Sequence, residues 1–268
     1  ACLVGSEMCI RDSIRMTASF DAIVVGGGTM GTSAALALAE RGARCLVLEQ
    51  FGLVHGLGSH GGRTRIIRQA YAESPDYVPL VQRAELAWLR LEQAVGVPIL
   101  HRTGGLDLQA PGFHWASEAR RAAEQHGIPH EWLDGGEVRK RWSAWSIGDE
   151  WRACYSPSTG FLDVEAALRS VACVANRHGV TIHEGEPVRE WSAEDASVVV
   201  TTDRNRYLAE RLVLTAGAWT ETMFRSLNLP ITVLRKVVWW FDVEDSAKFS
   251  LGRFPIFITE GPLGSIYG

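Results

Sequence analysis

The glycines at positions 26, 28 and 31 have the residue type and spacing that most directly predict a binding site in this chain. They follow an apolar stretch, 20–25, and precede a stretch of small residues, an order typical of a strand, a tight turn and a helix. Gly26 permits the turn, Gly28 lets the backbone approach a phosphate, and Gly31 lets the helix pack closely on the sheet. A helix N-terminus also offers free N–H groups and a partial positive charge. The segment therefore predicts a site for the pyrophosphate of a dinucleotide.

A second apolar segment ends on Glu49, 18 residues after Gly31. A carboxylate at this strand end can accept hydrogen bonds from ribose hydroxyls. Thr29 and Met30 at the start of the helix, and Gln50 beside the carboxylate, complete the predicted contacts with the dinucleotide. The pattern leaves FAD and NAD open, because both contain the same ADP half. The alternative is a strand–helix–strand unit whose glycines serve packing alone.

The composition of the 268 residues is ordinary for a soluble globular protein, with 46% hydrophobic residues. The net charge of −4, from 27 basic and 31 acidic residues, gives no indication of a nucleic-acid partner. No apolar run is long enough to cross a bilayer. The five cysteines have no metal-binding spacing with histidine. We therefore expect no membrane span and no metal site.

Residues 1–15 differ from the rest of the chain. Glu7, Arg11 and Asp12 stand where a signal peptide would need an apolar core, and the segment has no amphipathic repeat. We expect a non-native or disordered tail that makes no core contacts, with Met16 as the natural start. The lack of a signal peptide predicts a cytoplasmic location.

Apolar periodicity places helices and strands around the glycine segment. Helical spacing runs from Tyr77 to Val95 and recurs in 115–126, and Asp163 is positioned to cap another helix that ends at Gly179. Strands are expected at 98–109, 151–162, 180–183, 186–191, 196–202, 206–208, 211–216, 235–243 and 254–260.

Several longer motifs resemble those of a known family. They are VVGGGTMG at the glycine segment, GSHGGRTRIIRQAY from Gly58 to Tyr71, and LVLTAGAW from Leu212 to Trp219. On these motifs the chain resembles the amine-oxidising flavoproteins of the D-amino-acid-oxidase superfamily, and within it the branch of monomeric sarcosine oxidase and N-methyltryptophan oxidase. The block around TRIIR is far more specific than the three glycines.

The resemblance implies an α/β fold, in which a Rossmann-like FAD-binding domain is interleaved with an α+β substrate domain built on a mostly antiparallel sheet. The FAD-binding domain would comprise residues 17–100 and 156–231, and the substrate domain residues 101–155 and 232–268. The family continues past the last residue of this chain. We therefore expect the polypeptide to be a fragment, with an incomplete substrate domain, that is inactive or poorly folded alone.

The resemblance also implies FAD rather than NAD as the cofactor. The turn formed by Thr215, Ala216 and Gly217, with Trp219 after it, matches a second flavin-contacting segment of the family. Val188 matches a position whose backbone meets the adenine, although it is equally an ordinary strand residue.

Two further cofactor contacts are implied near the TRIIR motif. Thr64, within the motif, is expected beside the flavin. His60 stands one residue before the family's usual histidine position, which Gly61 occupies here. Either the loop is shifted by one residue or that contact is lost.

The implied reaction is oxidation of a secondary, N-methyl amino acid to an imine, with dioxygen reduced to hydrogen peroxide. Arg65 and Arg68 match the family's arginines at the flavin and at the substrate carboxylate. A guanidinium stabilises the negative charge of a reduced flavin and binds a carboxylate through two parallel hydrogen bonds. Tyr267 matches a tyrosine near the substrate, and a core aromatic in a strand is the competing interpretation. These three are the predicted catalytic residues.

Other functions remain open from the sequence. One alternative is another amine oxidase or dehydrogenase of the superfamily, of the pipecolate, glycine or dimethylglycine type. Another is a non-catalytic dinucleotide-binding module, and a third is an NAD-dependent dehydrogenase. For the oxidase we expect a monomer whose partners are a small amino-acid substrate and dioxygen.

Overall fold

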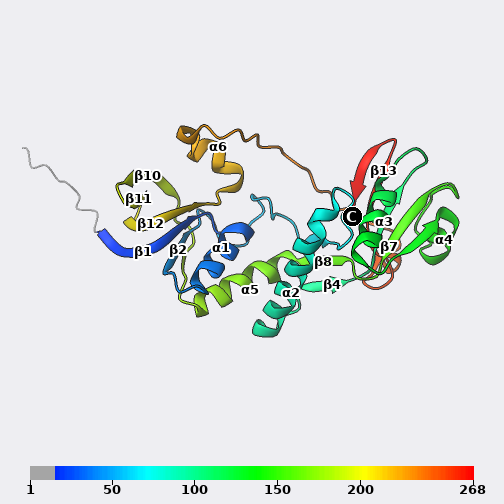
Figure 1. The fold of residues 1–268 in the computed structure, drawn as a ribbon, viewed down its shortest axis with the longest axis horizontal. Coiled ribbons are helices and arrows are strands. Elements are labelled where there is room, and N and C mark those ends of the chain that lie inside the picture. Colours follow the sequence, from blue (N-terminus) through cyan, green and yellow to red (C-terminus); the bar gives the residue numbers. More distant parts are fainter. Residues whose placement is uncertain (1–15) are drawn as a thin grey trace, which may run out of the picture. The chain divides into compact units, whose positions relative to one another are not determined.

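The structure is a computed structural model that describes residues 16–268. The expectations for residues 1–15 lie outside this range. The described chain divides into two compact units, which Figure 1 shows in the colours of the sequence. The first comprises the residues up to Ser59 with Ala175–Val233, and the second comprises His60–Val174 with Leu234–Gly268. Each unit combines strands with helices, so the predicted α/β class is confirmed.

The unit boundaries differ from the domain boundaries that the resemblance implies. Residues 60–100 and 156–174 belong to the second compact unit, whereas the resemblance places them in the FAD-binding domain. Compactness and contact with a cofactor are different criteria for a boundary. The assignment of FAD-binding and substrate domains therefore stays a prediction.

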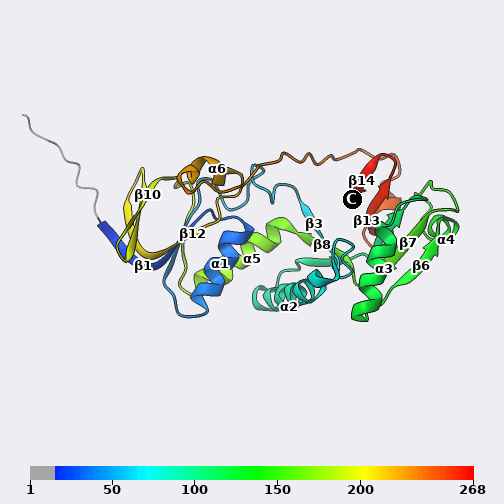
Figure 2. The same ribbon diagram turned by 45° about the horizontal axis from the view of Figure 1, so that its top comes forward.

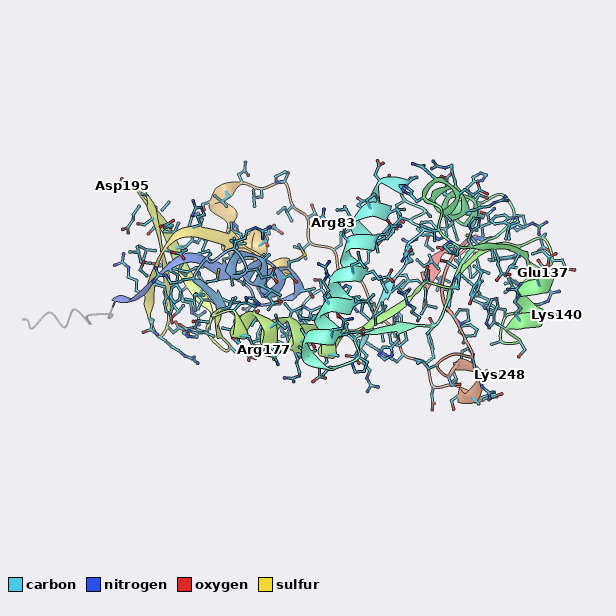
Figure 3. The ribbon with its side chains drawn as sticks, turned by 60° about the horizontal axis from the view of Figure 1, so that its bottom comes forward. Arg83, Glu137, Lys140, Arg177, Asp195 and Lys248 are labelled. Atoms are coloured by element: carbon cyan, nitrogen blue, oxygen red, sulfur yellow. The ribbon has the colours of Figure 1, made fainter. Side chains whose placement is uncertain are left out.

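A six-stranded sheet of order β10-β11-β12-β1-β2-β9 is the framework of the first unit. β12, β1, β2 and β9 are parallel, and β10 and β11 add an antiparallel hairpin whose turn carries Asp195, labelled in Figure 3. Because the carboxyl ends of parallel strands meet at one edge, the residues after β1, β2 and β12 lie close together. The strands are β1 (Met16–Val25), β2 (Cys45–Leu48), β9 (Thr181–His183), β10 (Val188–Glu194), β11 (Ser197–Thr202) and β12 (Arg206–Leu214).

Apolar residues cover both faces of the parallel strands. All four residues of β2, CLVL, are buried, as is typical of a parallel strand covered on two sides. Helix α1 (Thr29–Ala39) packs on one face, where Ala35 is fully buried against β1 and β2. On the other face the short helices η2 (Gly217–Trp219), α6 (Thr220–Met223) and η3 (Arg225–Leu227) bring Phe224 into the core.

Two smaller sheets build the second unit. The five-stranded sheet has the order β14-β13-β5-β7-β6, and only its β13–β5 pairing is parallel, so the expected mostly antiparallel sheet is present. The three-stranded sheet has the order β3-β8-β4. Their strands are β3 (Thr64–Ile67), β4 (Leu100–Arg102), β5 (Gly105–Gln109), β6 (Glu131–Asp134), β7 (Arg152–Ser156), β8 (Gly160–Asp163), β13 (Ile256–Gly261) and β14 (Gly264–Tyr267).

Local sequence signals explain where the helices begin and end. Helix α3 ends at Gly127, whose φ of 63° is left-handed, and Asp163 accepts a hydrogen bond from the Ala166 N–H at 2.8 Å at the start of α5. Both predictions are confirmed. Figure 2 shows α3 against the five-stranded sheet. The helices of this unit are η1 (Pro75–Tyr77), α2 (Val78–Val95), α3 (Trp115–His126), α4 (Gly135–Arg141), η4 (Ser246–Phe249) and α5 (Val164–Arg177), whose last turn belongs to the first unit.

The strand predicted at residues 235–243 is wrong. The segment has no regular structure, and Trp239 and Trp240 are both exposed, at 72% and 66%, rather than on alternate faces of a strand. An apolar run becomes a strand only where a neighbouring strand edge pairs with its backbone. Within residues 16–268 no strand pairs with this segment.

Candidate functional site

The glycine turn joins the end of β1 to the start of α1. Gly26 has φ of 102°, a left-handed conformation that favours glycine, and a Cβ on it would lie 2.4 Å from the Thr215 carbonyl oxygen. A Cβ on Gly31 would lie 1.9 Å from the Gly26 carbonyl oxygen. The N–H groups of Thr29, Met30 and Gly31 have no acceptor within the helix because they belong to its first turn. No side chain caps α1 at this end either. The turn therefore presents backbone donors to an anion.

Glu49, directly after β2, is fixed beside this turn. Its side chain is buried, with Oε2 accepting the Gly27 N–H at 2.7 Å and Oε1 accepting the Phe51 N–H at 2.8 Å. Each carboxylate oxygen has a further lone pair, so ribose hydroxyls can still donate to it. The neighbouring Gln50 is half-buried. Contact of either residue with ribose stays a prediction.

Thr215, directly after β12, forms hydrogen bonds with the backbone of the glycine turn. Its hydroxyl lies 2.9 Å from the Val25 carbonyl oxygen and 3.0 Å from that of Gly26, and its N–H donates to Val25. The family resemblance places Thr215 in the turn with Ala216 and Gly217, but the sequence assigned no role to its hydroxyl. A hydroxyl residue directly after an apolar strand was the available signal, but its partners lie 189 and 190 residues away.

Replacing Thr215 by valine is expected to destabilise the first unit by about 1 kcal/mol, because a hydroxyl hydrogen bond is lost at constant side-chain shape. The apparent Kd for FAD should rise about threefold as the turn loosens. Urea unfolding and fluorescence titration with FAD measure the two effects. Thr215→Ser keeps the hydroxyl and should match the wild type, and a Thr215→Val protein equal to wild type in both measurements would contradict the role of this hydroxyl.

The other predicted cofactor residues of the first unit lie around this core. Val188 and Ala216 are buried in the same apolar cluster, 7% and 9% exposed. Gly217 begins the η2 turn with φ of 53°, and the Trp219 ring packs on Phe51 with centroids 5.5 Å apart. Their contact with a cofactor is not tested by this arrangement and stays a prediction.

Arg65, Thr64 and His60 belong to the second unit. Arg65 and Thr64 begin β3, where Arg65 donates from Nη1 to the Thr64 carbonyl oxygen and from Nη2 to that of Gly61, both at 2.7 Å. Thr64 is exposed and His60 is half-buried. These bonds hold the Arg65 guanidinium against its own loop, and its role at a flavin stays a prediction.

Arg68 lies just beyond β3 and is buried, with 7% of the residue exposed. Its Cζ lies 4.5 Å from the centroid of the Tyr71 ring and 5.1 Å from that of Trp115. Nη2 donates to Glu73 at 2.5 Å, and Nη1 lies 3.5 Å from Asp107 Oδ1. Cation–π contacts and two carboxylates thus hold the guanidinium in place.

Asp107 was missed by the sequence analysis. It is a single acid within the buried strand β5, and its Oδ1 also accepts the Trp115 Nε1–H at 2.8 Å. Burial raises the pKa of Asp107 from 3.8 to about 6, against the opposing effects of Arg68 and of the Trp115 hydrogen bond. A lone carboxylate in an apolar strand was the signal in the sequence, since such a group needs a buried partner.

Tyr267 lies near the end of β14 and is 61% exposed. The competing interpretation, a core aromatic in a strand, is therefore wrong for this structure. Its proximity to a substrate is not tested and stays a prediction.

Comparisons with known proteins bear on this geometry. The sequence pattern of the DAO family, described as FAD dependent oxidoreductase, matches residues 21–267. Monomeric sarcosine oxidase of Bacillus sp. (strain NS-129) is 34% identical over 257 residues, which cover 94% of this chain and 66% of that protein. N-methyl-L-tryptophan oxidase of Yersinia pestis (strain Pestoides F) is 31% identical over 248 residues, with 92% and 66% covered.

The chain belongs to the DAO family of FAD-dependent oxidoreductases. The fold agrees with solved structures of such enzymes. The open form of NikD, an unusual amino acid oxidase essential for nikkomycin biosynthesis, matches with a TM-score of 0.72 and 29% identity, over 79% of this chain and 55% of that one. The chain spans about two thirds of the length of its curated relatives. At the level of the family, the prediction of FAD as the cofactor is confirmed.

The residues of the first unit fit the ADP half of FAD. Bare N–H groups at the start of α1 suit a pyrophosphate, and the buried Glu49 carboxylate beside them suits a ribose. Among residues 16–268 no group of three or more His, Cys, Asp or Glu side chains could hold a metal ion. In the same residues no helix has the length and apolar character that a bilayer span requires.

Proposed function

We propose that the protein oxidises a secondary amino acid of the N-methyl type to an imine, with dioxygen reduced to hydrogen peroxide. The main support is the combination of a dinucleotide-binding turn with 34% identity to a monomeric sarcosine oxidase. When bound, FAD would supply the redox chemistry: it would accept a hydride equivalent from the C–H bond beside the amine nitrogen, which loses a proton, and pass the two electrons on to dioxygen with two protons. The α1 N-terminus would hold its pyrophosphate, and Glu49 its adenosine ribose.

We propose Arg68 as the group that binds the substrate carboxylate. Aromatic rings hold its guanidinium and leave the edge nitrogens as donors. Nη1 is buried and makes no hydrogen bond within the described residues, although Asp107 lies 3.5 Å away. A buried donor without a hydrogen bond is costly, and a ligand carboxylate could satisfy it. We assign Arg65 to the flavin and Tyr267 to the substrate as parts of the same proposal.

The test is addition of sarcosine, N-methyltryptophan, pipecolate or glycine to the flavin-loaded protein. Oxidation of an amino acid should bleach the flavin absorbance, and air should restore it with peroxide formed. Arg68→Lys should raise KM for the best substrate at least tenfold, since an ammonium cannot bind a carboxylate through the same fork of donors. Arg63→Lys, at an exposed position directly before β3, is the matched control.

Each alternative has a distinct result in this experiment. Bleaching without oxygen uptake would indicate a dehydrogenase. Unchanged absorbance with every amine would overturn the proposal and indicate a module that binds the dinucleotide without catalysis. We also propose a monomer, which sedimentation of the flavin-loaded protein checks.

A further inference from the structure

A buried carboxylate outside the predicted site, Glu186, lies in the connection between β9 and β10 and is 2% exposed. Its Oε1 accepts the Thr202 hydroxyl at 2.7 Å and the Tyr207 hydroxyl at 2.8 Å, and its Oε2 lies 2.9 Å from His183 Nδ1. Arg204 Nη1 is 3.9 Å away. A buried carboxylate is costly unless its lone pairs are satisfied, so this cluster is a specific arrangement rather than a chance contact.

Two residues of the same cluster, His183 and Glu186, also form hydrogen bonds with the backbone of Glu49. The Glu49 N–H donates to the His183 carbonyl oxygen at 2.9 Å, and the Glu186 N–H donates to the Glu49 carbonyl oxygen at 2.8 Å. Because the side chains of His183 and Glu186 are themselves joined, residues 183–186 close around Glu49 from the β9 side. Two residues beyond Glu186, Val188 begins β10. One carboxylate therefore supports both residues that are predicted to meet the adenosine.

The remaining partners anchor this connection to the hairpin of β11 and β12. Thr202 ends β11, where its hydroxyl oxygen also accepts the N–H groups of Arg204 and Asn205, and Tyr207 lies near the start of β12. Burial, together with the hydrogen bond to Glu186, raises the pKa of Tyr207 to about 12, so its hydroxyl keeps its proton. Although burial opposes it, donation by Thr202 and Tyr207 holds the pKa of Glu186 below its ordinary value.

We propose that Glu186 is a positioning residue for the adenosine half of FAD. It acts through the backbone of Glu49, whose carboxylate it keeps beside the glycine turn. The inference rests on FAD binding at that turn and adds a residue that neither the glycine motif nor the family resemblance indicates. Tyr207 and Thr202 hold the Glu186 carboxylate in place by donating hydrogen bonds to it, and His183 contacts it from the β9 side.

The test compares Glu186→Ala and Tyr207→Phe with a control in the same region of the sheet. The control is Asp203→Ala. Asp203 lies in the turn between β11 and β12, and its replacement removes an exposed ion pair with Arg189 of β10. Calorimetric titration measures Kd for FAD and for ADP under conditions where circular dichroism shows each protein folded. We expect Kd for both ligands to rise at least tenfold in Glu186→Ala and about threefold in Tyr207→Phe, with Asp203→Ala unchanged.

Amide hydrogen exchange separates positioning from general stability. The N–H groups of Gly27 and Phe51 donate to the Glu49 carboxylate, so both should exchange at least tenfold faster in Glu186→Ala. The Ile23 amide, in the core strand β1, should keep its wild-type rate. A purely structural role would speed all three equally.

The outcomes are distinguishable. A folded Glu186→Ala protein with wild-type ADP affinity and wild-type exchange at Gly27 and Phe51 overturns the inference, whatever its melting temperature. Should Glu186→Ala not fold, Tyr207→Phe, which removes a single hydroxyl, decides by the same readouts. If the wild type binds neither FAD nor ADP, the proposed function fails, and the exchange rates still decide whether Glu186 positions Glu49.

Discussion

Alanine at position 31 is expected to displace the glycine turn and to weaken FAD binding about 100-fold. The added Cβ would lie 1.9 Å from the Gly26 carbonyl oxygen and 2.7 Å from Thr215 Oγ1, so backbone must move. Overpacking of this kind costs about 3 kcal/mol of the free energy of unfolding. Loss of two charge-assisted bonds from the turn to the pyrophosphate would cost about 3 kcal/mol of binding, which corresponds to the 100-fold change.

The matched control is Gly56→Ala in the same unit. Its Cβ would meet no atom within 4 Å, and its backbone is outside the left-handed region. Urea unfolding should therefore agree with the wild type within about 0.5 kcal/mol, and the Kd for FAD should be unchanged. Gly31→Ala protein with wild-type FAD affinity would show that the turn does not bind the cofactor.

The free energy of unfolding should fall by about 2 kcal/mol, relative to Asp107→Asn, as pH rises from 4.5 to 8. Burial raises the pKa of Asp107 from 3.8 to about 6, so the folded protein binds this proton more tightly than the unfolded chain does. The resulting stability is complete below the unfolded pKa and is lost as pH rises through 6. The two pKa values differ by about two units, or about 3 kcal/mol in all, of which about 2 kcal/mol falls in this interval.

Urea unfolding at a series of pH values measures this difference. Asparagine keeps the shape of Asp107 and an acceptor for the Trp115 N–H, while it removes the titrating group. The matched control is Glu165→Gln in the same unit, which alters a carboxylate that is 60% exposed and pairs with Arg169 rather than with Arg68. Its pH dependence should follow the wild type. A parallel pH dependence of wild type and Asp107→Asn would contradict the buried state of this carboxyl group.

Much of the candidate site could be predicted from the sequence because its signals are local. The order of strand, glycines and helix at residues 20–39 follows from steric and hydrogen-bonding rules that act over a few residues. The end of α3 at Gly127 and the cap at Asp163 are local in the same sense. The spacing of Glu49 also depended only on the length of one strand–helix–strand unit.

Contacts between distant segments were beyond sequence reasoning. Whether residues 235–243 form a strand depends on a partner edge, and the apolar pattern alone does not reveal one. The pairing of Arg68 with Asp107, 39 residues later in the sequence, depends on the register of β5 in its sheet. A one-residue shift of that register would turn the carboxylate to the opposite face.

The sequence by itself determined the residue types of the candidate site: a glycine turn after one apolar strand, an acid after the next, and arginines in a family-specific motif. Only the tertiary structure decided which groups support them. Thr215 binds the turn from 190 residues away, and Glu186 reaches Glu49 through the backbone rather than through a motif. The physical reason is that motif chemistry depends on residue type and spacing, whereas support depends on strand pairing and burial, which many different sequences can satisfy.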